Sequence, residues 1–191
     1  MKKLLLISVC ILCIQAKQIT TGVTVELQPY EGLSEVYVQE VYKNLVKLYP
    51  KIVINKPIKL PKSACVGGRY RSDTLLKYLR KSVTPGNKVI GLTDKDITCQ
   101  HRGSNDWGVF GYGDMPGSAC VASYYRLNKT KKAIQLYKTA AHELGHNFGL
   151  NHCPTTGCIM ADAKGKNNID NENGFCPICT SYLLKRNWTL K

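Results

Sequence analysis

One eleven-residue segment, residues 142–152, restricts the fold more than any other feature of the 191-residue sequence. It contains three of the four histidines of the chain, His142, His146 and His152. Residues four apart lie on one face of an α-helix, so a helix places His142 and His146 side by side. A helix cannot also bring His152 to that face, but Gly149 tolerates the positive φ at which the chain can turn back. The segment therefore predicts a helix that ends in a turn, with three imidazoles brought together.

Three converging imidazoles are a typical ligand set for Zn²⁺. Imidazole nitrogens bind this ion at about 2.0–2.1 Å, and a catalytic zinc site keeps a fourth position open. Glu143 follows His142 and is rotated from it by about 100° around the helix, so its carboxylate lies beside the metal rather than on it. A general base for a metal-bound water needs this position. We therefore expect a catalytic zinc at His142, His146 and His152, with Glu143 as the base.

Four cysteines that follow the histidines form a second candidate ligand set. They are Cys153, Cys158, Cys176 and Cys179. Two pairs at such spacings are typical of a tetrahedral structural zinc site. Residues 151–179 are rich in Cys, Asn, Gly and Asp, so they need a cross-link to hold a fixed structure. Two disulfides or a redox Cys-x-x-Cys are the alternatives, and export would favour disulfides. We expect a structural zinc here, which makes two Zn²⁺ per chain.

Three further cysteines lie outside these groups. Cys99 and Cys120 flank a predicted hairpin and could pair, which would leave Cys65 alone, although connectivity does not follow from sequence. The fourth histidine, His101, lies in a polar loop and is given no role.

Short apolar strands alternate with amphipathic helices before residue 150. Such alternation predicts βαβ units and a mostly parallel sheet. A hairpin is expected from residues 107–112 and 119–125, because residues 113–117 have the composition of a turn. The other predicted strands lie at residues 23–27, 52–54 and 88–92, and the predicted helices at 33–49, 72–81 and 130–149.

The first sixteen residues have the order of a secretory signal peptide. Two lysines precede an apolar run at residues 4–14, and the small residue Ala16 stands at a cleavage position. A buried N-terminal strand or helix is the alternative, and Cys10 or Cys13 could carry a lipid anchor. We expect residues 1–16 to be removed and the mature chain to be exported, to the periplasm or the medium.

The chain is basic, with 27 Lys and Arg against 13 Asp and Glu. This balance allows nucleic acid, an anionic membrane or an acidic polymer as a partner. The cations are scattered, however, and no nucleic-acid motif accompanies them, so we interpret them as a solvated surface. The longest apolar run, at residues 4–14, is shorter than the roughly 20 residues of a membrane span. We expect a monomer that binds no nucleic acid and has no membrane span in its mature form.

The motifs taken together resemble those of one known family, the archaemetzincins, which are zinc metalloproteases of the metzincin clan. The likeness is carried by the histidine segment at 142–152, by the four cysteines after it, and by Met160 between them. It extends upstream to residues 91–94 and 106–111 and so covers most of the mature chain.

The resemblance implies a metzincin-like three-layer α/β/α fold with a twisted, mostly parallel sheet. It implies an upper subdomain at residues 17–149 that contains the active-site helix. It also implies a small irregular subdomain at residues 150–191 that a structural zinc cross-links. These would form one metalloprotease domain. By family analogy, Met160 lies in a tight Met-turn beneath the catalytic zinc.

These expectations predict a zinc peptidase that acts on peptides or proteins. The strand around Val109, Phe110, Gly111 and Tyr112 is a candidate sheet edge that pairs with an extended substrate. The alternative is a zinc-stabilised, non-catalytic binding module with a basic surface. Glu143 favours the peptidase, because a binding module does not need a carboxylate beside an open metal position.

Overall fold

The computed structural model describes residues 22–101 and 103–190, and the predicted signal peptide lies outside the described residues. Its elements in chain order are β1 (Val25–Pro29), α1 (Glu35–Leu45), β2 (Ile52–Ile54), η1 (Lys62–Ala64), β3 (Cys65–Val66), β4 (Arg69–Arg71), α2 (Ser72–Ser82), β5 (Lys88–Thr93), β6 (Ile97–His101), β7 (Ser104–Val109), β8 (Gly111–Gly113), β9 (Ala119–Ser123), α3 (Lys132–Asn147), η2 (Ile169–Asn171) and α4 (Pro177–Leu184). The three helices predicted before residue 150 are confirmed as α1, α2 and α3, and three predicted strands as β1, β2 and β5.

The central sheet has five strands in the order β2-β1-β5-β9-β8. The first four run parallel, whereas β8 joins β9 antiparallel at one edge. Parallel neighbours need a crossover between them, and α1 and α2 supply two such connections. The predicted mostly parallel sheet is confirmed.

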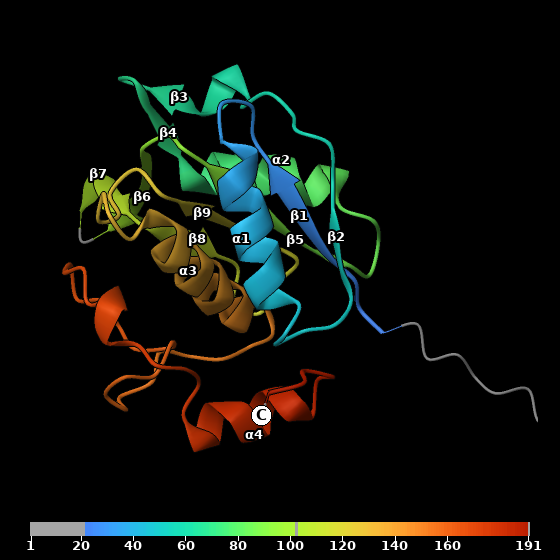
Figure 1. Ribbon diagram of the computed structural model, residues 1–191. Helices are drawn as coiled ribbons and strands as arrows, with labels where there is room; N and C mark the ends of the chain where they lie inside the picture. The colour runs from blue at the N-terminus through green and yellow to red at the C-terminus, as the bar shows by residue number, and fades with distance from the viewer. Residues whose placement is uncertain (1–21, 102, 191) are drawn as a thin grey trace, which may run out of the picture.

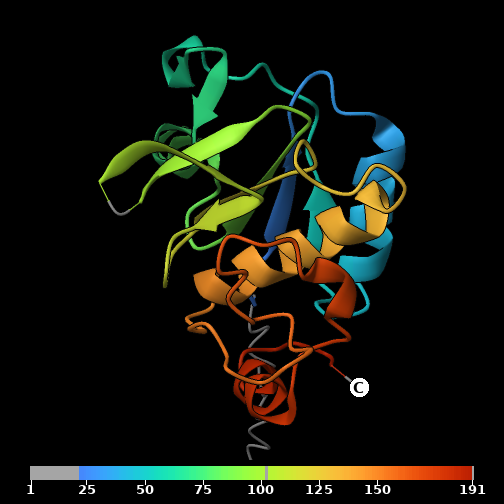
Figure 2. The ribbon, with the colours of Figure 1, turned by 90° about the vertical axis from the view of Figure 1, so that its left-hand side faces the viewer.

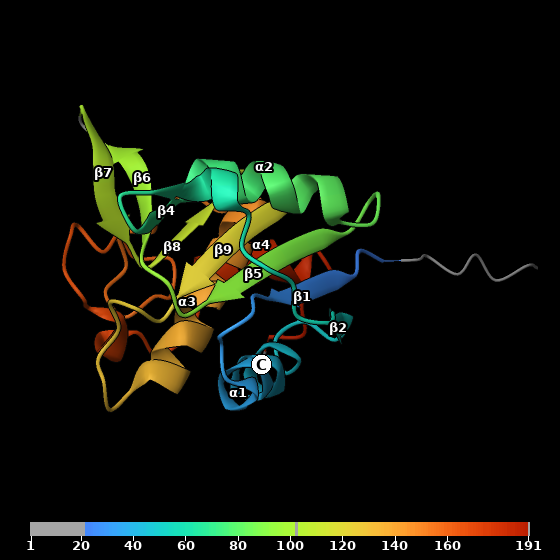
Figure 3. The ribbon, with the colours of Figure 1, turned by 90° about the horizontal axis from the view of Figure 1, so that it is seen from above.

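Helices cover both faces of this sheet, with α2 on one face and α1 and α3 on the other (Figure 3). Successive side chains of a strand point to opposite faces, so each face carries its own apolar cluster. In β5, Ile90 and Leu92 belong to the cluster with α1 and α3, whereas Val89 belongs to the cluster with α2. The predicted three-layer α/β/α architecture is confirmed.

A second sheet, in the order β3-β4-β6-β7, was not predicted from the sequence. It corrects the expected hairpin, because residues 107–109 belong to β7, which pairs with β6 instead of β9. Only β8, at residues 111–113, pairs with β9 as expected. Phe110 separates β7 from β8, so one predicted strand is divided between two sheets.

We refer to residues 22–149 as the upper region and residues 150–190 as the lower region. Helix α3 crosses the molecule between the sheet and the lower region (Figures 1 and 2). The lower region is mostly irregular and contains only η2 and α4. Sequence analysis did not predict α4, which begins immediately after Cys176.

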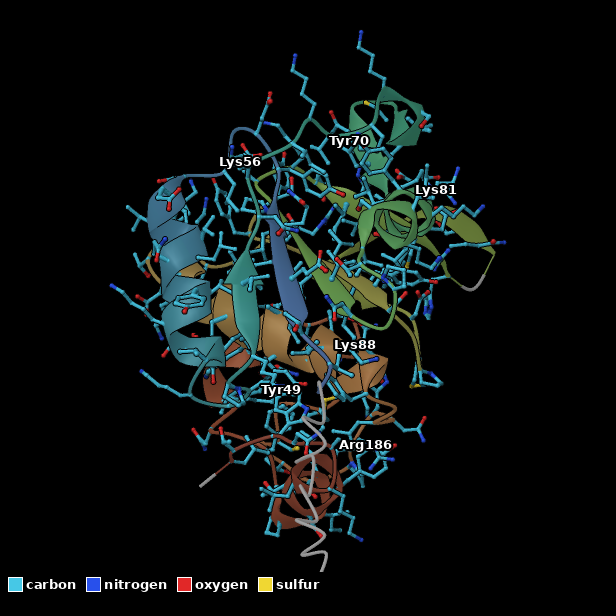
Figure 4. All side chains as sticks on the ribbon, turned by 90° about the vertical axis from the view of Figure 1, so that its right-hand side faces the viewer. Tyr49, Lys56, Tyr70, Lys81, Lys88 and Arg186 are labelled. Carbon is cyan, nitrogen blue, oxygen red and sulfur yellow. The ribbon has the colours of Figure 1, made fainter. Side chains whose placement is uncertain are left out.

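Exposed cations are spread over the surface. Lys56, Lys81 and Arg186 lie at well-separated places on one side of the molecule (Figure 4). Within the described part of the chain, no helix is both long and apolar enough to cross a membrane.

Candidate functional site

The three histidines predicted as metal ligands lie together, two of them on α3 and the third just after it. His142 and His146 project from successive turns of the helix, and their Nε2 atoms are 3.0 Å apart. The chain then turns at Gly149, whose φ is +97°, and returns His152 to within 5.3 and 4.8 Å of the two rings, centroid to centroid. One nitrogen from each of the three rings lies within 4.8 Å of the others, so the group could hold a metal ion.

Backbone carbonyls fix the orientation of two of these rings. Nδ1 of His142 is 2.6 Å from the carbonyl oxygen of Ile159, and Nδ1 of His146 is 2.7 Å from that of Leu150. A carbonyl only accepts, so Nδ1 donates in each pair and Nε2 keeps a free lone pair. Burial lowers the pKa of both rings, and with His146 nearby that of His142 falls to about 3. The rings are therefore neutral and oriented as zinc requires.

Glu143 lies under the edge strand β8. Its side chain is buried, and burial raises its pKa to about 8. A Cβ atom added at Gly111 would lie 2.5 Å from Oε1 of Glu143, and one added at Gly113 would lie 3.1 Å from Oε2. Position 111 therefore needs glycine for β8 to lie this close to the carboxylate, and position 113 leaves little room for a larger residue. Sequence analysis did not assign this role, which becomes visible only when β8 and α3 are packed together.

A cleft of about 1050 Å³ runs between β7, β8 and the lower region. The three histidines and Glu143 line it on the side of α3. The four residues predicted as a substrate edge also line it, namely Val109, Phe110, Gly111 and Tyr112. They span the junction of β7 and β8, and β8 is an edge strand of the central sheet.

The four cysteines of the lower region come together as a second group that could hold a metal ion. The Sγ atoms of Cys153 and Cys176 are 3.6 Å apart, and those of Cys158 and Cys179 are 3.8 Å apart. A disulfide needs about 2.05 Å. Four sulfurs placed 2.3 Å from a tetrahedral Zn²⁺ would instead be about 3.8 Å apart. The spacing therefore fits zinc ligation and not disulfides.

The pKa values of these thiols are shifted in different directions. Burial raises the pKa of Cys158 and of Cys179. Burial acts in the same direction on Cys176, but hydrogen bonds from the Cys179 backbone and from neighbouring side chains outweigh it and lower the pKa of that thiol. Zinc binds cysteine as the thiolate, so an ion bound here would displace the protons that burial keeps on Cys158 and Cys179.

Met160 is fully buried and packs against α3. Its sulfur packs against Gly145 of α3, and its carbonyl accepts a 2.7 Å hydrogen bond from the backbone of Cys153. The residue before it, Ile159, holds the ring of His142. The segment around Met160 therefore connects the two ligand groups.

The remaining cysteines do not form the disulfide considered from the sequence. Cys99 in β6 and Cys120 in β9 are free thiols in different sheets, and Cys65 is free and exposed. The strands that contain Cys99 and Cys120 do not pair with each other, because β6 joins β4 and β7 instead.

Comparisons with known proteins agree with this geometry. Residues 17–186 match the model of peptidase family M54. The archaemetzincin of Methanopyrus kandleri is 38% identical over 141 residues, which cover 71% of this chain and 78% of the relative. The archaemetzincin of Haloarcula marismortui is 28% identical over 176 residues, covering 84% and 99% of the two chains. The crystal structure of the Methanopyrus kandleri protein matches with a TM-score of 0.74 at 28% identity, over 88% of this chain and 97% of that one.

The fold and the histidine cluster define the class of protein as a zinc metallopeptidase, which confirms the predicted activity and disfavours the non-catalytic binding module. A peptidase of this class acts on peptide substrates. Within the class, the chain belongs to peptidase family M54, and the predicted resemblance to the archaemetzincins is thereby confirmed.

Proposed function

We propose that the chain hydrolyses peptide bonds in the cleft below β8, with His142, His146 and His152 as ligands of a catalytic zinc and Glu143 as general base. The observation that carries this proposal is the position of Glu143, buried against the glycines of β8 and on the same helix as two of the three converging imidazoles. When bound there, Zn²⁺ would lower the pKa of a water molecule and polarise the scissile carbonyl.

Glu143 takes the proton of the attacking water and returns it to the nitrogen of the leaving amine. Its burial removes competing solvent, and β8 holds its carboxylate in one place. The edge of β8 offers backbone groups that can pair with an extended substrate, which would involve Val109, Phe110, Gly111 and Tyr112. Met160 supports the ligands from below, in the role of a Met-turn.

A second zinc at Cys153, Cys158, Cys176 and Cys179 is part of the proposal, which makes two Zn²⁺ per chain. The sulfur spacing described above supports it. We further propose a single metalloprotease domain of residues 17–191 that acts as an exported monomer and binds no nucleic acid. The dispersed cations are in keeping with the last point.

The test compares the wild-type protein with Glu143→Gln on a peptide library, with zinc content measured in both. The variant should keep its metal and lose about 10²–10⁴-fold in kcat/KM. Glu31→Gln removes an exposed carboxylate elsewhere and should cleave like the wild type. Unchanged cleavage by the Glu143 variant would remove this residue as the base, and a wild-type protein that cleaves nothing in the library would favour a non-catalytic role.

A further inference from the structure

One acidic side chain of the cleft has no part in the proposed chemistry. Glu172 lines the cleft from the lower region, opposite Lys138 and Thr139 of α3 and close to Ile169. Lys138 and Thr139 lie about one turn before His142 in α3, and Ile169 and Glu172 of the lower region face them across this part of the cleft as its opposite wall. A substrate side chain next to the scissile bond can enter here.

The backbone of this wall is held firmly in place. Nζ of Lys138 donates hydrogen bonds to the carbonyl oxygens of Ile169, at 2.9 Å, and Glu172, at 2.5 Å. The neighbouring Asp170 accepts a 2.9 Å hydrogen bond from Gln135 and pairs with Lys131 at 3.0 Å. The segment is therefore fixed to α3, and the position of Glu172 is set before any substrate arrives.

The carboxyl group of Glu172 differs from that of Asp170 in its surroundings within the described part of the chain. Among the described residues, no side chain or backbone group forms a hydrogen bond or an ion pair with it. Burial raises its pKa to about 7, even though the ammonium of Lys138 acts in the opposite direction. A partly buried carboxylate without a partner is unfavourable, and a cation that reaches it would relieve this cost.

We propose that Glu172 is a specificity-determining residue that selects peptides with a lysine or arginine side chain beside the scissile bond. The inference rests on the proposed function and deepens it. The apolar stem of such a side chain can lie along Thr139 and Ile169, and its charged end can pair with the carboxylate of Glu172. Glu172 also lines a second cavity of about 600 Å³ under the segment 161–164, so the wall has room for a long side chain.

The peptide test compares the wild type with Glu172→Gln, which keeps the shape and removes the charge. The wild type should favour Lys or Arg at one position flanking the cleaved bond by at least tenfold in kcat/KM. Glu172→Gln should lose that preference, whereas Glu31→Gln should retain it. An unchanged preference in Glu172→Gln, or no cationic preference in an active wild type, would overturn the assignment.

A binding measurement separates this inference from the peptidase activity. n-Butylammonium is titrated into the zinc-loaded wild type and into Glu172→Gln, with shifts of backbone amide NMR signals at residues 169–172 as the readout. We expect saturable shifts in the wild type, at least tenfold weaker binding to the variant, and no such shifts with neutral n-butanol. Equal binding of the cation to both proteins, or no binding to the wild type, would overturn the inference whether or not peptides are cleaved.

Discussion

The upper and lower regions of the molecule are held together by different forces. The upper region has an apolar cluster on each face of a five-stranded sheet, and the cluster beside α3 continues into the lower region through Met160, Leu183 and Trp188. The lower region has one short α-helix and no sheet among its described residues. Apolar burial on both faces of a sheet can order the first region, whereas the lower region contributes only part of one cluster, and we expect it to depend also on its four cysteines.

The histidine cluster lies where the two regions meet. Helix α3 supplies two histidines from the upper region, and His152 comes from the lower region. Tyr49 and Trp188 also bridge the regions, with ring centroids 5.7 Å apart. A change in either region should therefore reach the active site, but by different routes and with different magnitudes.

The largest effect is expected from Cys176→Ser, which removes one sulfur ligand from the lower region. Apparent binding free energies of structural zinc are about 10–16 kcal/mol in zinc-finger peptides, and this free energy is linked to folding. We expect one zinc per chain instead of two, rapid proteolysis after residue 150, loss of peptide cleavage and an intact upper region. Metal analysis and limited proteolysis measure these outcomes.

The matched control for this change is Cys65→Ser, which alters an exposed thiol of the upper region. It should keep both metal ions and full activity. If Cys176→Ser remained resistant to proteolysis with its other cysteines oxidised, disulfides would replace zinc as the cross-link of the lower region.

The next largest effect is expected from a change in the apolar core of the upper region. Leu136 of α3 is fully buried in the upper region, so Leu136→Ala should lower the free energy of unfolding by about 2–5 kcal/mol. Chemical denaturation followed by circular dichroism measures the loss. Ile178→Ala in α4, where the side chain is 77% exposed, should change it by less than about 0.5 kcal/mol. Equal losses in the two variants would contradict the picture of a core confined to buried apolar residues.

Gly111→Ala tests the contact between the edge strand and the base. Its Cβ atom would meet Oε1 of Glu143 at 2.5 Å, so either the carboxylate or β8 must shift. A displacement of about 1 Å near the reacting atoms can cost about 10²-fold in rate, and we expect a loss of that order in kcat with normal zinc content. Gly22→Ala, where the new atom would meet the side-chain ends of Lys51 and Asn187 at 3.4 Å or more, is the control. Wild-type kcat in Gly111→Ala would show that Glu143 does not depend on β8.

The same comparison explains which features could be predicted from the sequence. The histidine turn could be predicted because its residues are close in the sequence. Helices α1 and α3 could be predicted because their apolar residues recur at helical spacing over long segments. The second sheet was not, since β6 contains Thr98, Gln100 and His101 and becomes a strand through pairing with β4 and β7. The helix α4 has only eight residues and follows an irregular segment.

The finer parts of the site were also hidden from sequence analysis. The roles of Gly111 and Gly113 depend on the distance between β8 and α3. In the sequence, nothing distinguishes Glu172 from other acidic loop residues. In the structure, Lys138 of α3 donates a hydrogen bond to its backbone carbonyl and fixes it beside the helix. These roles depend on contacts between segments that are far apart in the sequence. A local sequence pattern does not predict such contacts.

The smallest effect concerns pH and the unpaired carboxyl group of Glu172. Its pKa is about 7 in the folded protein against 4.5 for the free group, so the folded state binds its proton more tightly than the unfolded state does. The stability that this group contributes is complete below pH 4.5 and is lost as the pH rises through 7. Glu172→Gln cannot ionise and should therefore become more stable than the wild type above pH 7, by about 1–2 kcal/mol after allowance for solvent screening.

Measuring the difference between the two proteins from pH 5 to pH 8 removes the shared titration of the metal ligands. The gap in unfolding free energy should grow with pH, and n-butylammonium should reduce it at pH 8 by pairing with the wild-type carboxylate. A gap that stays constant across this range would mean that Glu172 ionises freely in the folded state. Its carboxylate would then already be well solvated, and it would have no more need of a cationic substrate than Asp170, which lies in the same segment and has its own partners.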